Sequence, residues 1–120
     1  MAVELDGFVA TLCQTQDFAG TDPQRLAALF ADHSESLDLR ITTGVVQEPT
    51  VRSGEPFTHL FLAQSGAVIA WQQPYSDLPL PFLVGIHELL LGTTRWVATY
   101  SATPGTTLIR IPTTTMDAVL

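Results

Sequence analysis

One arginine stands between an apolar segment and an alternating segment, where its charge could hold a ligand. Arg95 lies in the stretch VGIHELLLGTTRWVATY, which spans residues 84–100. A guanidinium group binds carboxylates and phosphates through paired, charge-assisted hydrogen bonds. The hydroxyls of Thr93 and Thr94 could donate to the same anion, and His87 could add positive charge because histidine changes its charge near neutral pH. The residue types therefore allow a small anion site.

Each of these residues also has a purely structural interpretation. Arg95 could begin a strand, with its apolar stem on the surface or its charge paired with Glu88. His87 could be an exposed helix residue, and Thr93 and Thr94 could form a turn. The residue types alone leave both interpretations open.

Other side chains form no recognisable catalytic or metal-binding pattern. The histidines, His33, His59 and His87, lack the histidine and carboxylate spacing of a small metal-binding barrel. Ser65 lies in no G-x-S-x-G stretch. The single Cys13 excludes an internal disulfide and a cysteine metal cluster, and we expect it to act as a buried small hydrophobe. We predict that the chain is neither an enzyme nor a metal protein and has no cofactor.

The charge balance excludes several classes of partner. Twelve acidic and five basic residues give a net charge of −7, which opposes both nucleic acid and anionic membranes. No apolar run approaches the ~18 residues of a membrane span. The first residues carry acids where a signal peptide needs a basic segment. We therefore expect a cytoplasmic protein that binds neither nucleic acid nor membrane.

The elements that position Arg95 form one domain over residues 1–120. Apolar spacing predicts helices within 1–34, with a helix start at Thr21-Asp22-Pro23. Short alternating segments fill 37–112, including one at 96–100, and a helix begins within 113–120. The predicted fold is mainly β with flanking α: an antiparallel β-roll or jelly-roll barrel of about eight strands.

The order of these segments resembles the cyclic-nucleotide-binding domain family. Its phosphate-binding cassette runs from Gly-Glu through a short helix to Gly, two further residues and Arg. The resemblance covers about residues 20–120. In chain order, the residues that carry it are Gly54-Glu55-Pro56, His59-Leu60-Phe61-Leu62, Ser65-Gly66-Ala67-Val68, Gly85, Gly92, Arg95 and Thr107-Leu108-Ile109-Arg110-Ile111-Pro112.

The resemblance implies a ligand site around the cassette. In the family, amide groups at a helix start and one arginine bind the cyclic phosphate, and a glutamate accepts a hydrogen bond from the ribose. A cyclic nucleotide or another small anion is the ligand that this implies. The corresponding contact residues are Gly85, Ile86, His87, Thr93, Thr94, Arg95 and Trp96.

Two positions depart from the family pattern. Ile86 stands where the family has its ribose glutamate, and Glu88 comes too late to replace it because two helical residues turn the side chain by about 200°. Trp96 stands where a small residue follows the arginine. A lost hydrogen bond to a charged group costs about 1.5–3 kcal/mol, or about 10–150-fold in affinity. We therefore predict that tight binding of cAMP or cGMP is absent and that any anionic ligand binds weakly.

Two functions remain open. The first is a regulatory ligand-sensing module in which a ligand shifts the flanking helices. The alternative is a protein-interaction or dimerisation domain with a vestigial pocket, whose partner or second copy binds the N-terminal helix through Leu5, Phe8, Val9 and Leu12. The DNA-binding members of the family carry a helix-turn-helix after the barrel; this sequence shows none, so if this chain is the whole protein we expect no self-contained transcription factor.

Overall fold

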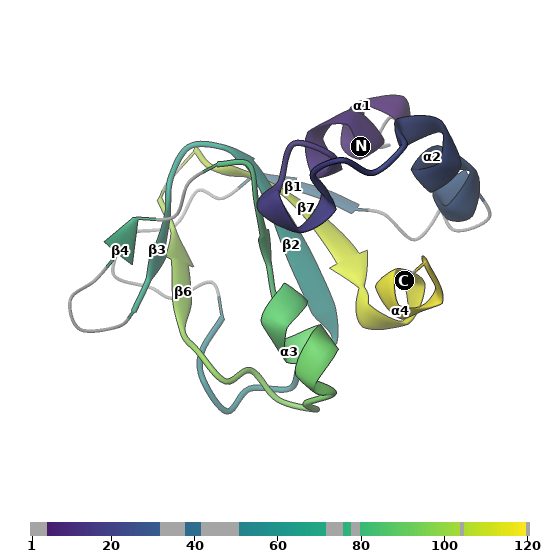
Figure 1. Ribbon diagram of the computed structural model, residues 1–120. Helices are drawn as coiled ribbons and strands as arrows, with labels where there is room; N and C mark the ends of the chain where they lie inside the picture. The colour runs from purple at the N-terminus through teal and green to yellow at the C-terminus, as the bar shows by residue number, and fades with distance from the viewer. Residues whose placement is uncertain are drawn as a thin grey trace.

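Four helices flank two small sheets in this computed structural model, which describes residues 5–31, 38–41, 51–71, 76–77, 80–103 and 105–119 (Figure 1). The helices α1, α2 and α4 lie on one side of the strands β2 and β7, and α3 lies apart from them. The helices, with one 3-10 turn at Gln16–Phe18, are α1 Leu5–Leu12, α2 Pro23–Ala31, α3 Ile86–Leu91 and α4 Thr113–Val119. Within the described residues, no helix has both the length and the apolar content needed to cross a bilayer.

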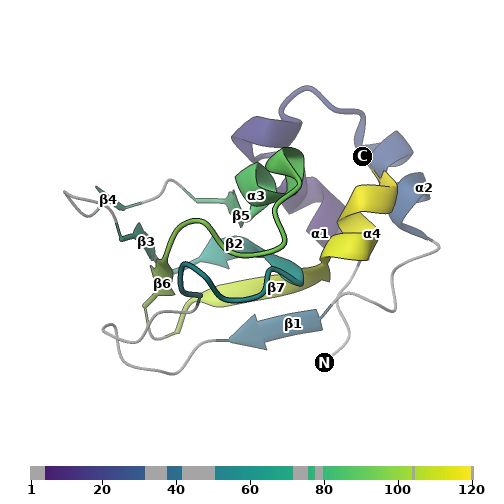
Figure 2. The same ribbon diagram turned by 90° about the horizontal axis from the view of Figure 1, so that it is seen from below.

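The strands form two antiparallel sheets. The larger sheet has the order β1-β7-β2-β5 and the smaller has the order β4-β3-β6. Figure 2 shows β1 at the outer edge of the larger sheet, beside β7. The strands are β1 Asp38–Ile41, β2 His59–Ser65, β3 Val68–Ala70, β4 Ser76–Asp77, β5 Phe82–Val84, β6 Tyr100–Ala102 and β7 Thr107–Pro112.

The central pair, β2 and β7, has two different faces because successive side chains of a strand point to opposite sides. On one face, Leu60 lies opposite Ile111 and Leu62 lies opposite Ile109, and all four side chains are buried. On the other face, Phe61 lies opposite Arg110, and both are only partly buried. The helices cover the first face, and the second faces the interior of the roll.

The helices pack into the main core. Asp22 caps α2 by accepting the Gln24 N–H at 3.0 Å, which confirms the predicted helix start. Phe8 of α1 meets Phe30 of α2 edge to face, with ring centroids 5.0 Å apart. Gln64 of β2 donates to the hydroxyl of an α1 residue, Thr11, at 3.5 Å. These contacts fix α1 and α2 on the sheet.

The apolar face predicted to bind a partner lies within this core. Phe8, Val9 and Leu12 are 1%, 1% and 0% exposed, and Leu5 packs against the same cluster. The proposed interface on the N-terminal helix was therefore the wrong assignment for these side chains, because a short helix must bury its apolar stripe on its own domain first. Binding of a protein partner or a second copy elsewhere on the N-terminal helix stays a prediction.

One strand prediction needs correction, and one stays a prediction. The described residues form seven antiparallel strands in two sheets, which confirms the mainly β fold with flanking helices, and a barrel of about eight strands stays a prediction. Residues 96–99 are not a strand, and β6 begins only at Tyr100. The reason is that the backbone of Trp96 exchanges hydrogen bonds with the turn at Gly54 and Glu55. The predicted extended segment at 44–46 lies outside the described residues.

Candidate functional site

The glycine-flanked helix α3 is the element that the sequence analysis selected. Gly85 precedes it at φ 105° and Gly92 ends it at φ 71°, both left-handed conformations that favour glycine. A Cβ atom added to Gly85 would lie 3.0 Å from Phe57 Cε1 and 3.0 Å from Trp96 Cη2. The glycine is therefore required because aromatic rings cover it.

Trp96 occupies the space beside the start of α3. Its side chain is 4% exposed. Its ring meets Phe57 edge to face at 4.9 Å, lies nearly parallel to Phe61 at 6.4 Å and 24°, and contacts Tyr100 at 6.1 Å. The indole of Trp96 therefore points into the protein and not toward solvent. Ile86, the other departure from the family pattern, is also buried, at 3% exposure.

Glu88 holds α3 to the segment that follows it. Its carboxylate is 2% exposed, and Oε2 accepts the Val97 N–H at 3.3 Å. Oε1 is buried without a hydrogen bond to any described group. The backbone carbonyl of Glu88 accepts the N–H of Thr93 at 3.1 Å and its hydroxyl at 3.3 Å. Burial raises the pKa of the Tyr100 phenol above its ordinary value, and the charge of Glu88 raises it further.

Arg95 lies on the surface, next to the turn before β2. Its Nη1 donates to the Gly54 carbonyl oxygen at 2.9 Å. Around it, Phe57 N–H donates to the Thr94 carbonyl at 3.0 Å and Trp96 N–H donates to the Glu55 carbonyl at 2.8 Å. The guanidinium therefore braces two loops, which is close to the structural interpretation given above, although its partner is Gly54 and not Glu88.

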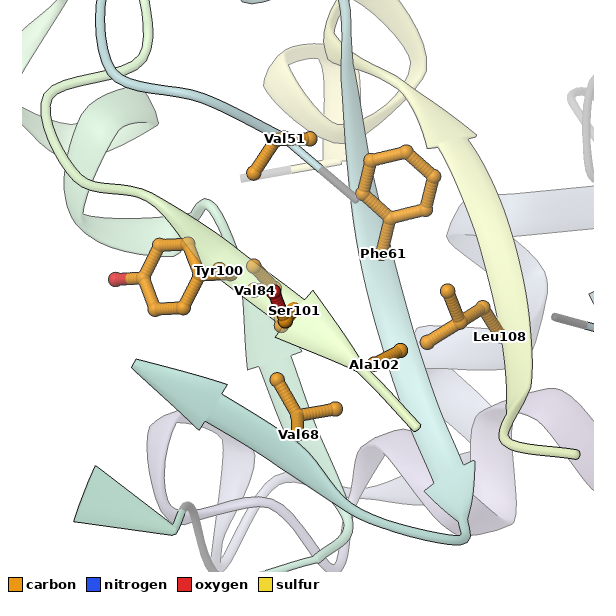
Figure 3. Close-up of a pocket in the computed structure, with 8 residues that line it drawn as sticks. All are labelled: Val51, Phe61, Val68, Val84, Tyr100, Ser101, Ala102 and Leu108. Carbon is orange, nitrogen blue, oxygen red and sulfur yellow. The ribbon is translucent and has the colours of Figure 1, made fainter. Parts of the chain in front are cut away.

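The interior of the roll is nearly filled. Figure 3 shows the residues that line it, with Phe61 and Leu108 from the larger sheet facing Val68 and Ala102 from the smaller one. The remaining cavity has a volume of about 10 Å³, which is at most the space for one water molecule. The hydroxyl of Tyr100 points away from the other residues in this view. No organic ligand fits here without moving side chains.

Two open clefts lie outside this interior. One, of about 360 Å³, runs between α3 and α4 and is lined by Leu89, Thr93, Thr94 and Asp117 among others. His87 lies on α3 but is exposed and does not line that cleft. The other cleft has a volume of about 350 Å³. Its lining residues are Val51, Glu55, Pro56, Thr58, His59, Phe61, Trp96 and Arg110.

The predicted contact residues do not share one cavity. Thr93 and Thr94 line the first cleft, Trp96 lines the second, and Arg95 lines neither. Sequence reasoning missed Arg110 as a site residue. The alternation of β7 could have found it, because Arg110 falls on the same face as the inward-facing Leu108. Among the described residues, no three histidine, cysteine, aspartate or glutamate side chains gather as a metal site would require.

Comparison with solved structures identifies the fold. The sensor domain of the transcriptional regulator DNR from Pseudomonas aeruginosa superposes with a TM-score of 0.62 at 22% identity, over 89% of this chain and 75% of that one. The cAMP-bound PfPKA-R (141–441) gives a TM-score of 0.72 at 16% identity, over 97% and 39%. The chain has the cyclic-nucleotide-binding-domain fold.

A third solved structure with this fold belongs to a kinase described as cAMP-independent. The regulatory subunit of a cAMP-independent protein kinase A from Trypanosoma brucei superposes with a TM-score of 0.69 at 16% identity, over 97% of this chain and 43% of that one. The chain thus spans under half the length of the two kinase-related structures. No family model matches the sequence, and no curated protein is similar enough in sequence to match.

Proposed function

We propose that the chain is a regulatory ligand-sensing module with the cyclic-nucleotide-binding fold that does not bind cAMP or cGMP tightly beside α3. The observation that carries this proposal is the position of Trp96, whose buried indole fills the space against Gly85. The burial of Ile86 supports it, because an isoleucine offers no acceptor for a ribose hydroxyl.

The filled site explains how a sensing fold could be kept without its usual ligand. A nucleotide would have to displace an indole that contacts three aromatic rings. Burying an aromatic side chain of this size stabilises a fold by about 1.5–3 kcal/mol or more. That energy would be subtracted from the binding free energy of any ligand that takes its place. Regulation would then depend on another ligand site or on a partner protein.

Thermal unfolding with cAMP and cGMP tests the proposal. A ligand at a hundred times its Kd stabilises a protein by about 2.7 kcal/mol, which shifts the melting temperature measurably. We expect millimolar cAMP or cGMP to leave the melting temperature of the parent protein unchanged. A nucleotide-dependent rise in the parent would contradict the proposal directly, whatever the variants do.

A double variant should gain the nucleotide binding that the parent lacks. Ile86→Glu with Trp96→Ala restores the acceptor and the small residue that the family pattern has at these positions. We expect this variant to gain a nucleotide-dependent rise in melting temperature, and we expect Arg95→Gln to remove that rise. Ile86→Glu alone is the matched control, because it adds the acceptor but leaves the indole in place.

A second candidate function is protein interaction through α3. Leu90 and Leu91, at the end of α3, are 69% and 73% exposed, and Val97, between α3 and β6, is 59% exposed. Adjacent exposed apolar side chains such as the two leucines mark interaction surfaces more often than isolated ones do. Replacing both leucines by serine should abolish any stable dimer seen by light scattering, with no change in the melting temperature of the monomer. A dimer that persists in this variant excludes α3 as the interface.

A further inference from the structure

We propose that the cleft around Arg110 binds a small organic monoanion with a flat apolar body, of the aryl carboxylate class. This proposal deepens the proposed function, because it assigns the sensed ligand to a site away from Arg95. The cleft has a volume of about 350 Å³, within the range of small-molecule sites. It adjoins the interior of the roll, since Val51 and Phe61 line both.

The charge in the cleft comes from an arginine on the inward face of the sheet. Arg110 lies opposite Phe61 in the β2–β7 register, its side chain is half-buried, and its Nε is fully buried. Only five basic residues occur in a chain of net charge −7, so a half-buried arginine beside a cleft is an unusual local source of positive charge. A guanidinium has five N–H donors and can bind a carboxylate while it keeps another partner.

The apolar part of the ligand has a wall to lie on. Phe61 and Trp96 both line the cleft, and their rings lie nearly parallel, at 24° with centroids 6.4 Å apart. Aromatic ligands gain about 0.5–1.5 kcal/mol from such stacking beyond the area that they bury. The cleft also has polar lining, because the Thr58 hydroxyl lies 2.9 Å from His59 Nδ1 and both residues line it.

The carboxylate of Glu55 sets the charge that the ligand can carry. It lines the cleft while its Oε1 accepts the Arg52 N–H at 2.7 Å. Its negative charge repels a second negative charge on the ligand, so a monoanion should bind better than a dianion of the same shape. Benzoate should therefore bind better than phenyl phosphate.

The cleft is connected to a helix that could report its occupancy. The N–H of Thr113, the first residue of α4, donates to the Thr58 carbonyl at 3.0 Å. The strand β7, which carries Arg110, ends at Pro112 and α4 begins at the next residue. The start of α4 is therefore held by the chain connection to β7 and by the hydrogen bond to Thr58. A ligand that draws Arg110 and Thr58 together would move both.

Titration with benzoate tests the site. In a Trp71→Phe background, Trp96 is the remaining tryptophan and its fluorescence reports on the cleft. We expect a saturable change with benzoate and none with neutral benzamide. Arg110→Gln should weaken benzoate binding by at least about tenfold, the loss expected for a hydrogen bond to a charged group. Arg25→Gln, an exposed arginine on α2, is the control and should bind as the parent does.

Several outcomes would overturn the assignment. These are the absence of a saturable signal in the parent, equal affinity in Arg110→Gln, and loss of binding in Arg95→Gln instead. If Arg110→Gln does not fold, Arg110→Lys replaces it in the test. Lysine keeps the positive charge but lacks the paired N–H groups of the guanidinium, so it should still weaken benzoate binding. Benzoate binding that depends on Arg110, together with a nucleotide-dependent rise in melting temperature that depends on Arg95, would support this cleft while contradicting the proposed function, so the two proposals can fail separately.

Discussion

The two faces of the β2–β7 pair contrast within a few residues. On the helix-covered face, Leu60 and Leu62 are fully buried and lie opposite isoleucines. On the roll face, His59, Phe61 and Arg110 are partly exposed and border an open cleft. The same two strands therefore supply a close-packed core on one side and, on the other, a face that is buried at Ala63 and Leu108 but borders an open cleft at Arg110.

The two faces of the β2–β7 pair should contribute differently to the stability of the fold and to ligand binding. A close-packed face tolerates little change, because each missing methylene leaves a cavity. The roll face carries His59 and Arg110, and it opens to solvent at the cleft. Ligand chemistry should therefore be sought on the roll face, and the stability of the fold should depend mainly on the helix-covered face.

The largest expected effect tests this separation. Leu62→Ala should lower the free energy of unfolding by about 2–5 kcal/mol, because the side chain is 0% exposed and its neighbours cannot close the cavity. His59→Ala, on the opposite face of the same strand, should lower it by clearly less, because that side chain is only partly buried. Urea unfolding of both variants measures the difference. Equal losses would show that the two faces contribute alike.

The sequence predicted the helix-covered face better than the roll face. The start of α2 and the strand β7 followed from capping and alternation, which are local signals. The direction of Trp96 did not follow, because it depends on Phe57 and Phe61, which are remote in sequence. The same holds for Arg95, whose partner Gly54 lies 41 residues away. Contacts of this kind are set by tertiary packing, and no local pattern encodes them.

A comparison of two glycines tests how tightly the roll face closes over α3. Gly85→Ala and Gly92→Ala both place a side chain at positive φ, which costs about 1–2 kcal/mol. Only Gly85→Ala also presses on Phe57 and Trp96, because nothing lies within 4 Å of the added atom at Gly92. We expect Gly85→Ala to be less stable than Gly92→Ala by a further ~1–3 kcal/mol. Equal stability in urea unfolding would mean that the aromatic rings yield easily.

The smallest expected effect concerns the alkaline side of the stability profile. Burial raises the pKa of Tyr100, and the charge of Glu88 adds to the rise. The folded state therefore keeps the phenolic proton to higher pH than the unfolded state does. The retained proton stabilises the folded state. This stabilisation is complete below the pKa of about 10 in the unfolded chain and is lost as the pH rises through the higher pKa of the folded state.

Two variants sharpen this last test. The free energy of unfolding of the parent and of Tyr100→Phe is measured in urea from about pH 8 to about pH 11. Tyr100→Phe should lose less stability than the parent over this range, and the difference between the two is the contribution of this phenol. Glu88→Gln should reduce that contribution without removing it, because the carboxylate is the lesser of the two causes. If Glu88→Gln removed the whole dependence, the charge of Glu88 would outweigh burial. The environment of Tyr100 would then be polar, and the roll face would be less closed around α3 than its packed aromatic rings imply.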